Sequence, residues 1–250
     1  MTDTTDLTGL AEQVAKLLKE IDRLHAVNEI QNVMAQYEYW HYPELFPRKT
    51  ELFALSMPDV SMDLSNGGIF TGKSALEFLW NELLGKAGKE PGAMFIHPLT
   101  TPNIQVAADG QTAKGIWISP GLETYYYGHE HTCPDGHVEG NAPMRAYWCW
   151  GRYACDFIKE DGAWKIWHMK WIRDFRCDYY QSWVDDRTSA STVANYPQFG
   201  RPDIKECRYH EPYDPKVRRK AIPAIPEPYD SFDHPDWIYA GYEDIIPPRK

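Results

Sequence analysis

The sequence lacks long apolar runs, a surplus of basic residues and the common nucleotide-binding motifs. No window approaches the roughly 18 consecutive apolar residues of a membrane span. The first residues, MTDTTDLTGLAEQV, show neither the basic nor the apolar region of a secretory signal. A formal net charge of −10 argues against a general nucleic-acid binder. Because GxGxxG, P-loop and GxSxG motifs are missing, dinucleotide, ATP and α/β-hydrolase chemistry are unsupported.

Cysteine is scarce and odd in number. The five cysteines are widely spaced, at positions 133, 149, 155, 177 and 207. This spacing favours reduced thiols over a disulfide framework, so we expect a cytoplasmic protein. Aromatic residues are abundant instead, with ten Trp and sixteen Tyr, which is ample for a packed core.

Helical signals come first along the chain. Apolar residues recur at three- and four-residue intervals over 6–27, at Leu10, Val14, Leu17, Leu18, Ile21 and Leu24, and predict one helix. A second helix is predicted from about Ala26 to Tyr39. Further on, Ser74 and Glu77 form a capping-box pattern that opens a helix reaching about Gly85.

The periodicity then changes to two. Two short strands are predicted around Asn66-Gly67-Gly68. Longer strands follow, joined at Asp109-Gly110 and at Glu160-Asp161-Gly162, over residues 93–107, 112–128, 143–159 and 163–175. Helices followed by long antiparallel strands indicate the α+β class, here a strongly curved, cone-shaped antiparallel sheet wrapped around N-terminal helices.

The C-terminal part has a different composition. Ten of the nineteen prolines fall within residues 197–250, mixed with Tyr and Trp. A disordered tail is poor in such aromatics, so we expect an extended arm that packs on its own domain or on a neighbouring subunit. The predicted organisation is an N-terminal helix (1–24), a cone domain (25–185) and the arm (186–250).

These signals, in this order, resemble the SnoaL-like, nuclear-transport-factor-2-like superfamily. The stretches that carry the resemblance span roughly residues 25–175: ELFALSMPDVSMDL, GIFTGKSALEFLW, HPLTTPNIQVAADGQTAKGIW and GRYACDFIKEDGAWKIWHMKW. The resemblance implies a cone with a deep pocket. It implies little about function, because the fold hosts dehydratases, isomerases, cyclases, dehydrohalogenases and non-enzymes.

His97 is the leading catalytic candidate. Scytalone dehydratase and hexachlorocyclohexane dehydrochlorinase, which the sequence resembles, place a catalytic His on the strand where His97 falls. Both pair that His with an acid near the end of the preceding long helix. Here the helix end reads YEYWHY over 37–42 and holds no Asp, so the partner of His97 stays open. An apolar pocket would favour a neutral imidazole able to move a proton; a hydrogen-bonded core histidine is the alternative.

Other residues are candidates for the same pocket. Tyr39, His41 and Tyr42 offer proton donors or an oxyanion partner, or else form an aromatic lid. Asp63 could orient His97 or supply the missing acid, and Lys170 could neutralise a developing oxyanion if its face is the inner one. Glu123 is a further candidate whose face is not assigned. Candidates for substrate binding are Trp40, Phe95, Trp117, Tyr125, Tyr127, Trp148 and His168.

A metal site is not expected. His129, His131, Cys133 and His137 have suitable donor types, but their spacing matches no standard zinc pattern. The segment HEHTCPDGH is better interpreted as a hairpin tip near the pocket mouth. We therefore predict no metal and no cofactor.

Together these features favour a cofactor-independent lyase that acts by acid–base catalysis. The predicted substrate is a small phenolic or diaryl compound of the lignin-derived type, which loses water or formaldehyde through a quinone-methide-like state. A weaker resemblance to bacterial formaldehyde-releasing lyases points the same way. The alternatives are an isomerase or cyclase in the same pocket, and a non-catalytic binding or assembly protein. The resemblance also implies a homodimer or homotrimer that pairs through the outer face of the sheet.

Overall fold

A computed structural model of the chain describes residues 4–87, 91–126, 144–186, 199–207, 213–233 and 235–241. Among the helices in these ranges, none combines the length and the apolar character needed to cross a membrane. Cys149, Cys155, Cys177 and Cys207 are free thiols, and Cys133 lies outside the described residues.

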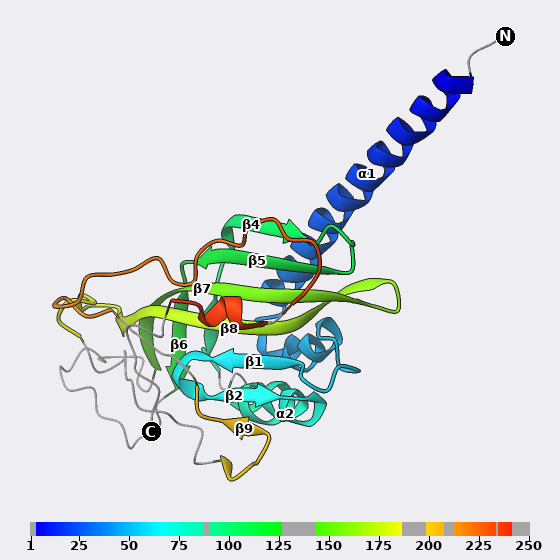
Figure 1. Ribbon diagram of the computed structural model, residues 1–250. Coiled ribbons are helices and arrows are strands. Elements are labelled where there is room, and N and C mark those ends of the chain that lie inside the picture. Colours follow the sequence, from blue (N-terminus) through cyan, green and yellow to red (C-terminus); the bar gives the residue numbers. More distant parts are fainter. Residues whose placement is uncertain are drawn as a thin grey trace.

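The chain begins with one continuous helix, α1 (Thr4–Tyr39), so the prediction of two separate helices is wrong. No Pro or Gly interrupts the sequence around residue 26, and the backbone therefore continues without a break. The first half of α1 projects from the body (Figure 1). The second half turns Ile30, Met34 and Tyr37 into the core, where each is at most 1% exposed.

The body is built on a nine-stranded curved sheet. Its main order is β3 (Met94–Ile96), β6 (Leu122–Tyr126), β7 (Met144–Glu160), β8 (Ala163–Asp178), β1 (Ser61–Leu64), β2 (Ile69–Thr71) and β9 (Ile204–Lys205). Off this path, β5 (Thr112–Ser119) pairs with both β7 and β4 (Thr100–Val106). All pairs are antiparallel except β1 with β8, which run parallel. The α+β cone with helices at its N-terminal side is thus confirmed.

Two of the long predicted strands are interrupted. The stretch 93–107 divides into β3 and β4, which pair with different strands, β6 and β5. The stretch 112–128 divides into β5 and β6 around Pro120-Gly121, and both pair with β7. Each break contains a proline, which cannot donate a ladder hydrogen bond. The break after Ile96 places His97 at a switch point of the sheet.

Short helical segments complete the body. They are η1 (Pro43–Leu52), η2 (Ser65–Gly67), α2 (Lys73–Glu77), the π-helical turn η3 (Phe78–Leu83), α3 (Leu84–Ala87) and η5 (Pro235–Tyr239). The predicted capping box is wrong: Gly72 is the N-cap, and no side chain caps α2. Ser74 instead accepts a hydrogen bond from Arg201 at 2.8 Å.

The two faces of the sheet are both covered. On the inner face, Met169 and Trp171 of β8 join a core that includes Tyr37 and Trp80. On the outer face, Ile238 of η5 packs against Ile116, Ala154 and Ile172. In Figure 1 the C-terminal segment, orange to red, crosses this outer face.

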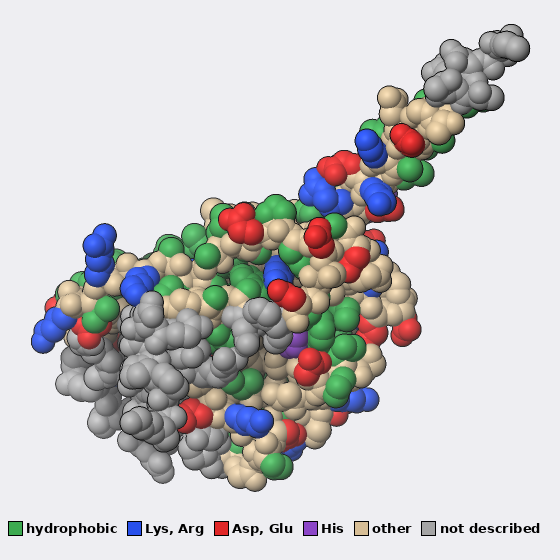
Figure 2. All heavy atoms as spheres, in the orientation of Figure 1, with side chains coloured by type: hydrophobic (Ala, Val, Ile, Leu, Met, Phe, Trp, Pro, Cys, Tyr) green, Lys and Arg blue, Asp and Glu red, His purple; other side chains and the backbone are tan. Residues whose placement is uncertain are grey.

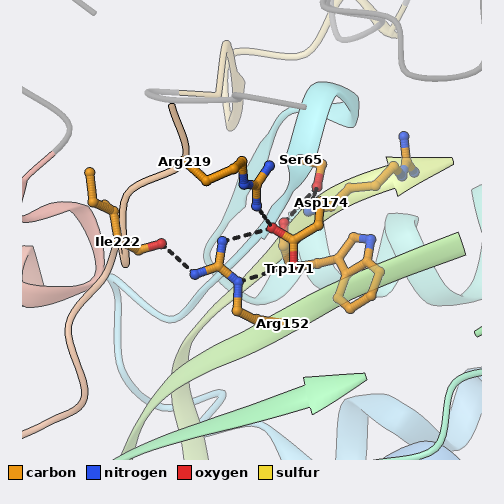
Figure 3. Close-up of polar contacts among 7 residues, drawn as sticks. Ser65, Arg152, Trp171, Asp174, Arg219 and Ile222 are labelled. Atoms are coloured by element: carbon orange, nitrogen blue, oxygen red, sulfur yellow. Dashed lines mark hydrogen bonds and ion pairs between the residues drawn. The ribbon is translucent and has the colours of Figure 1, made fainter. Parts of the chain in front are cut away.

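Ion pairs also attach the C-terminal segment to the sheet (Figure 3). Arg219 donates to Asp174 of β8, and the same carboxylate accepts two hydrogen bonds from Arg152 of β7. Arg152 also donates to the carbonyl of Ile222 at 2.6 Å. Arg219 belongs to the basic stretch KVRRK, residues 216–220. One basic residue of this stretch therefore binds the sheet.

Truncating Ile238 should destabilise the fold, because its side chain is 2% exposed and closes the outer apolar cluster. Ile238→Ala should lower the free energy of unfolding by about 2–4 kcal/mol, measured by urea denaturation. The control is Ile225→Ala in the same segment, where the side chain is 57% exposed and the loss should stay below about 0.5 kcal/mol. Equal effects of the two variants would contradict the packing described.

Candidate active site

A pocket of about 370 Å³ opens between the end of α1 and the segment 93–98. Five of the residues that line it were predicted from the sequence: Tyr39, His41, Tyr42, Phe95 and His97. Glu38 lines it as well. The rest of the lining is mostly apolar, with Met94 and Ile96 from β3. The pocket therefore combines titratable groups with an apolar wall, as small-molecule sites do.

His97 is held tightly at the strand switch. His97 is 7% exposed. The centre of its ring lies 5.4 Å from that of Trp171, in an edge-to-face arrangement. Gly121 makes this position possible: a Cβ there would collide with His97 Nδ1 and would lie 2.6 Å from the carbonyl oxygen of Cys149. Only a glycine at the β5–β6 break leaves room for the buried imidazole of His97.

Glu123 of β6 is the partner of His97. Its Oε1 lies 3.3 Å from His97 Nε2, and its Oε2 lies 2.8 Å from Arg176 Nε. Burial acts to raise the pKa of Glu123, but Arg176, His97 and Arg173 outweigh it and hold the pKa well below its usual range. Glu123 is therefore ionised and is placed to accept a hydrogen bond from His97 Nε2, which leaves Nδ1 as the ring nitrogen that the carboxylate does not contact.

The second ring nitrogen of His97 is buried. Among the described residues, its Nδ1 has no hydrogen-bond partner. A buried polar atom without a partner is costly and is often explained by function. The His97–Glu123–Arg176 chain thus orients the imidazole of a residue that lines the pocket, while its Nδ1 packs against Gly121.

Glu38 is a candidate acid that the sequence reasoning missed. Its side chain is 11% exposed, and burial raises its pKa to about 7 against the counteracting charges of Lys49 and His97 and a hydrogen bond from Tyr153. The end of α1 contains no Asp. A Glu in the YEYWHY stretch, one methylene longer, carries the same carboxyl group, and that signal could have identified it.

Lys49 of η1 was also missed. It is fully buried, its Nζ lies 4.0 Å from the ring centre of Tyr37 and 4.6 Å from that of Trp80, and desolvation lowers its pKa well below the usual value. Aromatic faces are favourable neighbours for a cation, so the ring cage holds this amine in the interior.

His41 joins Glu38 to Lys49. Its Nδ1 lies 2.9 Å from Lys49 Nζ and 2.9 Å from Glu38 Oε2. Burial, Lys49 and His97 lower the pKa of His41 well below its usual value, so its imidazole is neutral. His41 Nδ1 therefore lies close to both an amine and a carboxyl group.

Two His–carboxyl pairs therefore meet at one pocket. One is His97 with ionised Glu123, and the other is His41 with Glu38; the two imidazole rings are 5.4 Å apart. The first pair can accept a proton, and a carboxyl with a pKa of about 7 can donate one near neutral pH. Groups whose pKa values are pushed apart in one site are the usual basis of acid–base catalysis.

Three predicted residues lie elsewhere. Asp63 and Lys170 pair with each other at 2.6 Å on the outer face of the sheet, where Tyr239 of η5 donates to the same carboxylate. His168, on that face too, lies 2.9 Å from Asp156. Asp63 therefore cannot orient His97, and Lys170 and His168 do not face the pocket. The inner face of β8 carries Met169 and Trp171 instead.

The remaining aromatic candidates also differ from expectation. Trp117 is 3% exposed and packs on Phe157 in the core. Trp148 is 37% exposed and stacks on Tyr179, while Trp40 lies under the guanidinium of Arg48. None of the three lines the pocket. The side chain of Tyr125, and Tyr127 as a whole, lie outside the described residues.

One set of metal-type donors occurs in the described part of the chain: His97, Glu123 and Cys149, with ligand atoms within 4.8 Å of one another. The donor chemistry does not suit a metal. Arg176 already neutralises Glu123, and burial raises the pKa of the Cys149 thiol strongly, whereas metals bind the thiolate. The residues His129, His131, Cys133 and His137 lie outside the described residues.

Comparisons with a protein family and with solved structures agree with the fold described above. The SnoaL-like domain family matches residues 22–170. The structure of LinA is 18% identical, with a TM-score of 0.50, over 66% of this chain and 96% of LinA. A candidate scytalone dehydratase from Novosphingobium aromaticivorans is 17% identical, with a TM-score of 0.48, over 65% of this chain and 93% of that protein. No curated protein sequence matches. At such identities the similarity to LinA shows the fold alone.

The raised pKa of Glu38 should make the free energy of unfolding depend on pH. A carboxyl whose folded-state pKa is about 7 binds its proton more tightly than the unfolded chain does. Its stabilising contribution is fully present below about pH 4.5 and is lost as the pH rises to about 7, with a total loss of about 3 kcal/mol.

Urea denaturation of wild type and Glu38→Gln at several pH values measures this loss. The difference in unfolding free energy between the two proteins should shift in favour of the variant as the pH rises through this window. Because all other titrating groups are common to both proteins, the difference isolates Glu38. A difference independent of pH would show that Glu38 has an ordinary pKa.

Proposed function

Because the chain belongs to the SnoaL-like family, a fold that presents a pocket to small molecules, we propose that it is a lyase that works by acid–base catalysis without a cofactor. The observation that carries the proposal is the meeting of two buried His–carboxyl pairs at one apolar pocket. Each pair provides groups that can move protons. Elimination reactions need one group that takes a proton and one that gives a proton.

The roles follow from the protonation states. His97, held by Glu123, accepts a proton from the substrate carbon. The electron pair of the broken C–H bond forms the new double bond, and the C–O bond to the leaving hydroxyl breaks. Glu38 in its protonated form gives its proton to that hydroxyl, which leaves as water. Because Glu38 has a pKa of about 7, both protonation states are populated near neutral pH.

The pocket lining favours a small aromatic substrate. Phe95, Met94 and Ile96 form one wall, and Tyr39 and Tyr42, which are 69% and 59% exposed, stand at the opening with rings that contact each other edge to face. A phenol conjugated with the reacting carbon supplies electrons for elimination without a metal. Loss of formaldehyde from a hydroxymethyl group on such a substrate is the second outcome that we propose to test.

An isomerase is the alternative that the same geometry favours. Because the two His rings are 5.4 Å apart, a proton taken by His97 can be returned by the second pair to another atom of the substrate. The two reactions differ in product mass, which an isomerase leaves unchanged.

The decisive experiment is turnover of a substrate panel. Purified protein treated with a chelator is incubated with phenolic diaryl-propanoid and hydroxylated ring compounds, and the products are analysed by mass spectrometry. A product lighter by water or formaldehyde supports the lyase, and a new product of equal mass supports the isomerase. Binding of panel members without any turnover would contradict both and indicate a carrier.

Replacing His97 should stop catalysis but not binding. His97→Gln should lower kcat by about 10²–10⁴ and change the ligand Kd little, because the lining that surrounds the ring remains. The matched control is His168→Gln on the outer face, where Gln can keep a hydrogen bond to Asp156; kcat should stay within about threefold. If His97→Gln kept kcat within about tenfold of wild type in a folded protein, His97 would not be the base.

A further inference from the structure

The first half of α1 carries an exposed apolar row. Leu10, Leu17 and Leu24 are 53–63% exposed, and Leu7, Val14 and Ile21 are 45–69% exposed. Figure 2 shows this part of the helix extending away from the body into open space. A row of six large apolar side chains at such exposure is unusual for a protein surface and marks a contact surface.

The row follows a heptad repeat. Successive members are three and four residues apart from Leu7 to Leu24, which is the a/d pattern of a coiled coil. Leu7, Val14 and Ile21 occupy the a positions, and the three leucines at 10, 17 and 24 occupy d. The charged residues of the same stretch, Glu12, Lys16, Lys19, Glu20, Asp22 and Arg23, all fall outside a and d.

The row faces away from the body. Ala26 and Ile30, which begin the buried face of α1, are 4% and 0% exposed. Ala26 lies two residues after Leu24 and therefore about 200° around the helix from it. A helix that packs on the row consequently lies on the side of α1 opposite to its own sheet, so two bodies can sit on the outer sides of a helix pair without collision.

The pattern specifies the partner as another copy of the same helix. Branched residues at a, here Val14 and Ile21, with Leu at d favour parallel two-stranded coils. Asn28, exposed and at the next a position, is the type of residue that sets parallel register by pairing with its own equivalent. The outer sheet face around Ile116 and Ile172 is covered by Ile238 of the same chain, so that apolar cluster is not free for pairing.

We propose that residues 7–28 form a parallel, two-stranded coiled coil with the same residues of a second copy of this chain. Most of the stability of a helix in a protein comes from packing of its apolar face. Pairing buries the six row side chains and stabilises the projecting half of α1. The pocket and the sheet of each subunit stay separate, so the proposal is independent of the proposed function.

Sedimentation of the full chain tests the proposal. At about 50 μM the wild type should sediment as a dimer of 58.0 kDa, twice 29.0 kDa, and dissociate on dilution. Ile21→Lys places a charge at the centre of the seam and should raise the dimer dissociation constant at least tenfold. The control Ala15→Lys adds the same charge to the same exposed helix at a b position, outside the seam, and should leave the dimer intact. Both side chains are exposed, so neither change disturbs the body.

Oxidative crosslinking tests the orientation. Leu10→Cys places a thiol at a d position, which faces its own equivalent only in a parallel, in-register pair. Oxidation should therefore give a covalent dimer in this variant and none in wild type. A wild type that stays monomeric, an oligomer that Ile21→Lys leaves intact, or a dimer that Leu10→Cys does not crosslink would overturn the proposal.

Discussion

The ion pair between Glu123 and Arg176 is the contact on which the candidate site depends. It lies in the interior at 2.8 Å and keeps Glu123 ionised in spite of its burial. An ionised Glu123 holds Nε2 of His97 and so fixes the orientation of the imidazole ring. Loss of Arg176 would remove the largest of the charges that lower the pKa of Glu123, and a less compensated buried carboxylate is costly.

For Glu38 the balance between burial and neighbouring charges has the opposite outcome, because burial dominates and the pKa is raised. Its neighbours are His41, neutral through burial, and Lys49, whose own pKa is lowered; these compensate its charge only in part. The outcome is one carboxyl that stays ionised and one that titrates at about pH 7. Position within the cone, rather than residue type, thus separates the two carboxyl groups into different chemical roles.

Much of the fold and part of the candidate site could be predicted from the sequence. The predictions that were wrong failed for physical reasons. Alternation and turns located β7 and β8 closely, and His97, His41, Tyr39, Tyr42 and Phe95 do line one pocket. Lys49 could not be found because a short 3₁₀ segment leaves no periodicity that marks an inward position. Asp63, His168 and Lys170 were misplaced because the arm buries the outer face, so both faces of β8 look like core faces in the sequence.

The contacts between the arm and the sheet also constrain how these distant parts of the chain can change during evolution. Tyr239 shares its acceptor with Lys170, and Trp237 donates to Asp156 beside His168. A substitution at either end of such a contact removes one hydrogen bond to a buried carboxylate, which selects for a compensating change at the other end. Among related sequences, the outer face of the sheet and residues 235–241 should therefore have changed together, whereas relatives without an arm escape that constraint.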